Sequence, residues 1–152
     1  MPAFQLCADF SLFPDDTVLG PSFTLAGFDF NQLGGNPDQL FVNVTADERG
    51  LQFPREGLEI TLPIPVTTVD LRLGTFAGPV EITALDSTGR RVRRQTIQGL
   101  NRYRNIKLSA REVASVIFRE GGNEGILPRI CVIVCCDSHI TSHQYERIDE
   151  NE

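Results

Sequence analysis

Apolar residues at every second position are the feature that most constrains this chain. Residues 4–12 alternate between apolar and other side chains, and the same two-residue period returns at 58–64, 69–73 and 80–84. A period of two places alternate side chains on opposite faces of an extended strand, so these segments are predicted to be half-buried β-strands. Turn residues separate the runs, and no long helical pattern interrupts them. The sequence therefore predicts an all-β sandwich or barrel.

Local signals refine this prediction. Asp86-Ser87-Thr88-Gly89 is typical of a hairpin turn, because Asp accepts backbone hydrogen bonds and Gly adopts a positive φ. Ser109 and Glu112 form an S-x-x-E capping box, which predicts one helical turn within residues 109–118, followed by a strand. A chain of 152 residues has the size of a single domain. We place the sandwich at residues 1–136 and a polar, acidic C-terminal tail at 137–152.

Three segments between Gly50 and Val132 resemble a known family. They are VDLRLG at 69–74, VEITALDSTG at 80–89 and VASVIF at 113–118. Their order resembles the galactose-binding-like jelly-roll domains of bacterial surface proteins and carbohydrate-binding modules. The resemblance implies an antiparallel, jelly-roll-like β-sandwich, a location at the cell surface or outside the cell, and carbohydrate as a ligand class. The N-terminus lacks the features of a secretory signal, so a cytoplasmic location stays open.

The same resemblance implies a structural calcium ion as the one cofactor to consider. Carboxylate and amide oxygens are the ligands that calcium prefers. The residues that supply them are Asp15, Asp16, Glu120, Asn123, Glu124 and Asp137. Cys135, Cys136, His139 and His143 have ligand types that suit zinc, but their spacing is not a standard one, and no metal site is predicted from them.

Four cysteines lie in the predicted terminal strands. Cys7 is in the first strand, and Cys131, Cys135 and Cys136 are in the last. Terminal strands of jelly rolls lie close together, so a disulfide from Cys7 to the last strand is one alternative. Four reduced, buried thiols are the other, and the sequence does not decide between them.

Charge is distributed unevenly along the chain. Residues 90–119 carry nine basic side chains and one acid, although the whole protein has a net charge of −6. We expect no nucleic-acid partner, because the remaining acidic surface would repel it. An acidic surface on a second copy of the chain is a better match. We therefore predict an interface between copies that uses Arg90, Arg91, Arg93 and Arg94.

The predicted last strand, residues 129–136, is apolar on both faces. A strand at the surface of a sandwich is normally polar on one face, so something must cover the second face. The tail, the N-terminal segment or another subunit could do so. Ile133 and Cys135 lie on that second face and join the predicted interface. No apolar run reaches the roughly 20 residues that a membrane-spanning helix needs.

A glycan-binding cluster is the alternative to the interface. Arg102, Tyr103 and Arg104 combine a ring that could stack on a sugar with guanidinium groups that could bind hydroxyls or acidic sugars. The alternative reading of Tyr103 is a half-buried strand residue. No catalytic motif is found, and both histidines fall in the predicted tail, so we predict a protein that is not an enzyme.

Two functions follow from these features. The first is a structural subunit that assembles with itself into a coat, fibre or other homo-oligomer. The second is a carbohydrate-binding, lectin-like module. They differ in partner: the first requires a second copy of the chain, and the second requires a glycan.

Overall fold

The computed structural model describes residues 4–134, and these form eleven β-strands and two short 3-10 turns. The strands are β1 Phe4–Asp9, β2 Val18–Gly20, β3 Ser22–Leu25, β4 Phe28–Gln32, β5 Leu40–Thr45, β6 Glu48–Phe53, β7 Leu58–Thr75, β8 Val80–Leu85, β9 Arg91–Ile97, β10 Arg102–Glu120 and β11 Gly125–Val134. The 3-10 turns are Phe10–Leu12 and Gly121–Asn123. Neither turn within this range is long and apolar enough to cross a membrane.

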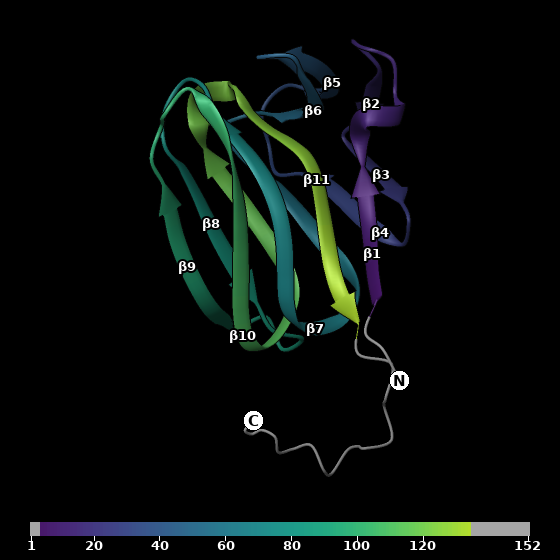
Figure 1. Ribbon diagram of the computed structural model, residues 1–152, viewed down its shortest axis with the longest axis vertical. Coiled ribbons are helices and arrows are strands. Elements are labelled where there is room, and N and C mark those ends of the chain that lie inside the picture. Colours follow the sequence, from purple (N-terminus) through teal and green to yellow (C-terminus); the bar gives the residue numbers. More distant parts are fainter. Residues whose placement is uncertain (1–3, 135–152) are drawn as a thin grey trace.

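Two layers of antiparallel strands pack face to face (Figure 1). Layer I follows the order β3-β4-β7-β10-β8-β9. Layer II follows the order β1-β11-β7-β10. The first half of β11 also pairs with β6, and the layer continues from β6 to β5 and then to β2. The predicted all-β antiparallel sandwich is confirmed. The domain boundary predicted at residue 136 lies outside the described residues.

Strands β7 and β10 belong to both layers. Their pairing shifts register between Ser109 and Ser115, opposite the Pro63-Ile64-Pro65 stretch of β7. Proline lacks an amide donor and is tolerated where a ladder is interrupted, and bulges bend a strand. The first half of β7 therefore lies in layer I and the second half in layer II.

The helical turn predicted for residues 109–118 is wrong. Strand β10 continues through this region, and the carboxylate of Glu112 does not cap a helix. Its Oε1 atom instead accepts hydrogen bonds from the backbone N–H and the hydroxyl of Ser87, at 3.0 and 2.8 Å. Pairing with β7 and β8 outweighs a local capping signal, because it satisfies many more backbone groups.

The first alternating run is also shorter than expected. Strand β1 ends at Asp9, and Phe10–Leu12 form a 3-10 turn. The Asp9 carboxylate caps this turn by accepting a hydrogen bond from Ser11 N at 2.9 Å. Phe10 turns into the core and contacts Phe30 edge to face, with ring centroids 5.5 Å apart. The core between the layers consists of the inward-facing apolar residues of both layers.

Candidate functional site

Two adjoining cavities lie on the outer face of layer II. The larger has a volume of about 570 Å³ and the smaller about 460 Å³, and both are lined by Asp9 and Arg129. We call the two together the groove. The larger part is lined by Gln5, Cys7, Asp9, Asp70, Leu71, Asn105, Ile106, Lys107, Arg129 and Cys131. The smaller part is lined by Asp9, Ser11, Val44, Asp47, Glu48, Arg49, Pro128 and Arg129.

Strand register brings the polar residues of the groove together. Because alternate residues face outward, each of β1, β11, β7 and β10 contributes one outward side chain to each row across the layer. One row contains Asp9, Arg129, Arg72 and Asn105. The next row contains Cys7, Cys131, Asp70 and Lys107. Residues separated by up to 124 positions thus form one surface.

Arg72 is held by several neighbours. Its Nε and Nη2 atoms donate to the two carboxylate oxygens of Glu48, at 2.6 and 3.0 Å. Its Nη1 atom donates to Asn105 Oδ1 at 3.0 Å. The hydrogen bond to Glu48 raises the pKa of Arg72 above its ordinary value. This bidentate ion pair connects strand β7 to the start of β6 at one end of the groove.

Tyr103 supports the same end of the groove from the side. Its hydroxyl donates to the carbonyl oxygens of Thr45 and Glu48, at 2.9 and 3.2 Å, and so holds the β5–β6 hairpin. The Arg72 guanidinium lies 5.4 Å from the centre of its ring. Burial, and then the negative charge of Glu48, raises the pKa of Tyr103 to about 12.

Gly74 makes this arrangement possible. It lies opposite Tyr103 in the ladder, and a Cβ atom placed on it would meet the rings of Phe76 and Tyr103 at 2.6 and 2.7 Å. Those two rings meet edge to face, with centroids 5.1 Å apart. A larger residue at position 74 would displace Tyr103 and loosen the hairpin.

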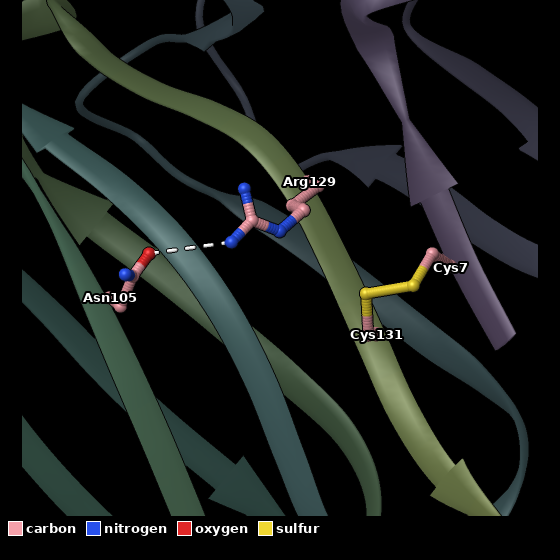
Figure 2. The surroundings of a disulfide bond; sticks show 4 residues. All are labelled: Cys7, Asn105, Arg129 and Cys131. Atoms are coloured by element: carbon pink, nitrogen blue, oxygen red, sulfur yellow. Dashed lines mark hydrogen bonds between the residues drawn. A yellow bond between two sulfur atoms is a disulfide. The ribbon is translucent and has the colours of Figure 1, made fainter. Parts of the chain in front are cut away.

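A disulfide joins Cys7 of β1 to Cys131 of β11, with Cα atoms 4.1 Å apart (Figure 2). It is one of the pairings that the sequence left open. It lines the larger part of the groove beside Arg129, so it gives that surface a polarisable, weakly polar patch. It also fixes β1, whose partner among the described strands is β11 alone, to the rest of layer II. Cys135 and Cys136 lie outside the described residues.

Three cations are among the lining residues of the groove, Arg49, Lys107 and Arg129, and they differ in their partners. Arg49 is half-buried, and its Nη1 atom donates to the Ser11 carbonyl oxygen at 3.2 Å. Lys107 Nζ lies 3.9 Å from Asp70 Oδ1. Arg129 Nη2 donates to Asn105 Oδ1 at 3.5 Å, as Figure 2 shows, and within residues 4–134 no carboxylate lies within 4.0 Å of its guanidinium. Among these three lining cations, Arg129 is therefore the one that is exposed and has no carboxylate partner within the described residues.

The residues predicted to form a glycan-binding cluster do not come together on one face. Tyr103 is half-buried and supports the groove. Arg102 and Arg104 are its neighbours in β10, and strand alternation places them on the opposite face. Sequence analysis missed Glu48, Arg72, Asn105 and Arg129. Arg72 and Arg129 were polar residues within predicted strands, which any surface strand shows, and Glu48 and Asn105 lay outside the strand positions that were predicted.

The residues predicted to form an interface lie mainly on β9, away from the groove. Arg91, Arg93 and Arg94 are exposed on this strand, and Arg90 precedes it. Arg94 pairs with Glu81, and Arg93 Nη1 donates to the Ser109 carbonyl at 3.4 Å. Ile133 is half-buried opposite Gln5, and Cys135 lies outside the described residues. The structure contains one chain, so assembly stays a prediction.

The calcium and zinc candidates gain no geometric support in the described part of the chain. Residues 4–134 contain no group of three or more His, Cys, Asp or Glu side chains that could hold a metal ion. Asn123 uses its side-chain oxygen to accept from Arg55 N at 2.8 Å. Asp137, His139 and His143 fall outside the described residues.

Comparison with known proteins identifies the architecture. No protein-family model matches the sequence, and no curated protein matches it. The structure is similar to a family 29 carbohydrate-binding module, with a TM-score of 0.53 at 11% identity over 88% of this chain and 90% of that one. A mutant of a family 29 module complexed with mannohexaose gives a TM-score of 0.52 at 10% identity over 88% of this chain and 93% of that one. The chain therefore has a β-sandwich fold like that of carbohydrate-binding modules, as the resemblance implied.

Proposed function

We propose that this protein binds carbohydrate in the groove of layer II and does not act as an enzyme. One observation carries the proposal: the outer face of four adjacent strands presents cations, carboxylates and an amide side by side over a cavity of about 570 Å³. Sugar hydroxyl groups both donate and accept hydrogen bonds, so neighbouring donors and acceptors on a rigid sheet can hold two hydroxyls of one ring.

The surface of the groove also fits the apolar side of a sugar ring. The Cys7–Cys131 disulfide lies among these polar groups. Cys131 is 3% exposed and Cys7 is half-buried, so Cys7 is the part of the disulfide that a sugar ring would contact. The groove has no aromatic residue among its lining residues, so contact with the disulfide takes the place of ring stacking. The fold supports this function, because the similar structures are named as carbohydrate-binding modules and one of them holds mannohexaose.

Titration calorimetry with a broad set of neutral and acidic oligosaccharides tests this proposal. We expect at least one oligosaccharide to bind the wild-type protein, and we expect Asp70→Ala to weaken it by about tenfold or more. Asp70 lines the larger part of the groove, between its ladder partners Cys131 and Lys107, and a carboxylate acceptor forms strong hydrogen bonds to hydroxyls.

Thr96→Ala is the matched control, because Thr96 is exposed on β9 in the other layer. It should bind as the wild type does. Absence of binding to the whole set, or an Asp70→Ala protein that binds as well as the Thr96→Ala protein, would refute binding in the groove.

A further inference from the structure

Two guanidinium groups lie side by side on the outer face of layer II. Arg72 of β7 and Arg129 of β11 are direct partners in the antiparallel ladder. Like charges placed directly opposite each other in a sheet destabilise it. Both groups direct a donor to the same neutral atom, Asn105 Oδ1, at 3.0 Å from Arg72 and 3.5 Å from Arg129. The two guanidinium groups therefore share a neutral amide oxygen, which binds them more weakly than an anionic oxygen would.

The nearby carboxylates balance the cations in number, but none of those within residues 4–134 forms an ion pair with Arg129. Glu48 binds Arg72 with both oxygens, and Asp70 lies 3.9 Å from Lys107. Asp9 is the ladder partner of Arg129, but its Oδ1 accepts from Ser11 N, and no ion pair joins it to Arg129. Asp47 also lines the smaller part of the groove, where no ion pair joins it to Arg129 either.

Arg129 is free to bind a ligand because its contact with Asn105 is weak. A separation of 3.5 Å is beyond the usual range of an N–H···O hydrogen bond. The side chain is exposed, and it borders both parts of the groove. A planar guanidinium presents paired N–H donors that match the geometry of a carboxylate or a sulfate.

We propose that the groove recognises an acidic glycan, and that Arg129 binds its anionic group beside Arg72 and Asn105. This inference rests on the proposed carbohydrate-binding function and names the class of sugar. Uronic acids and sulfated sugars offer the same chemistry, a planar or tetrahedral set of anionic oxygens on a sugar ring. The anion would give Arg129 the ion pair that it lacks within residues 4–134, whereas Arg72 already has one with Glu48.

The experiment uses matched pairs of oligosaccharides. Oligouronides are compared with their carboxyl-reduced forms, and sulfated oligosaccharides with their desulfated forms, by calorimetry on the full chain at about 0.1 M salt. We expect an acidic member to bind at least about tenfold more tightly than its neutral counterpart. The uronide and sulfate arms show which anion is preferred.

Arg129→Gln should abolish the difference between acidic and neutral members. Arg91→Gln is the matched control: it removes the same charge from exposed β9, and it should keep the difference. Circular dichroism and thermal unfolding establish that both variants are folded, and Arg129→Lys should restore part of the preference.

The outcomes separate the two proposals. Equal binding of acidic and neutral members by the wild type would overturn the acidic-glycan inference and leave carbohydrate binding standing. Binding of no member would overturn both. Equal losses in Arg129→Gln and Arg91→Gln would show that overall charge, and not the groove, attracts the anion, and would also overturn the inference.

Discussion

Tyr103 links the hairpin, the sheet and the groove through one side chain. Its ring packs against Phe76 and beneath Arg72, and its hydroxyl holds two carbonyl oxygens of the β5–β6 hairpin. We expect Tyr103→Phe to lower the free energy of unfolding by about 1–2 kcal/mol, because it leaves two acceptors without their donor. Urea denaturation measures the change. Unfolding midpoints equal to those of the wild type would contradict this role.

Tyr103 also predicts how stability responds to high pH. Its pKa is raised to about 12 in the folded protein, whereas an unfolded tyrosine titrates near 10. The folded state therefore favours the neutral phenol, and this contribution to stability is present below about pH 10 and is lost as pH rises towards about 12. A Tyr145→Phe background leaves Tyr103 as the only tyrosine, so phenolate absorbance then reports Tyr103 alone. If the Tyr103 phenol of the folded protein titrates near pH 10, the Tyr103 side chain is not buried in solution.

Single residues also show why the site was harder to predict than the fold. The apolar alternation of residues 69–73 and 80–84 is a local property, and β7 and β8 form there as expected. The contact between Arg129 and Asn105 depends instead on the register of β11, β7 and β10, which no local pattern specifies. The same limit explains the error at Glu112, whose true partner, Ser87, lies 25 residues away.

At the level of elements, β1 depends on the disulfide more than any other strand of the groove. It lies at the edge of layer II, pairs with β11, and contributes Gln5, Cys7 and Asp9 to the larger part of the groove. We expect a Cys7→Ser/Cys131→Ser protein to lose about 2–4 kcal/mol of stability. We also expect faster hydrogen exchange at Leu6 and Ala8, and weaker glycan binding, because one wall of the groove is no longer fixed.

A Cys135→Ser/Cys136→Ser protein is the control for this change. It keeps the bond between β1 and β11, so its unfolding and exchange should match those of the wild type. If the two double variants are equally stable in denaturant, the disulfide does not stabilise β1.

At the level of the whole molecule, most of the basic residues of 90–119 form no ion pair within the described part of the chain; Arg94 and Lys107 are the exceptions. Arg91 and Arg93 are exposed on β9, which pairs with β8 alone among the described strands, and the rest of the protein is acidic. If this edge contacts acidic surface on a second copy, a species larger than the monomer should form at low salt. It should dissociate near 1 M salt, where the screening length falls to about 3 Å.

Size-exclusion chromatography with light scattering checks this prediction. Arg91→Glu/Arg93→Glu should shift the protein towards monomer, whereas Arg55→Glu, an exposed change outside the basic segment, should not. A monomer at high protein concentration and low salt would rule out assembly through β9.

The pairing of Phe4 with Val134 has a topological consequence. It places residue 4 and residue 134 side by side on adjacent strands, so a short connector could join them. A chain joined there and opened instead at the Asp86–Gly89 turn would be a circular permutant with the same strand pairs. The two ends of the described chain thus lie close enough for such a permutant to keep every strand pair of the sandwich.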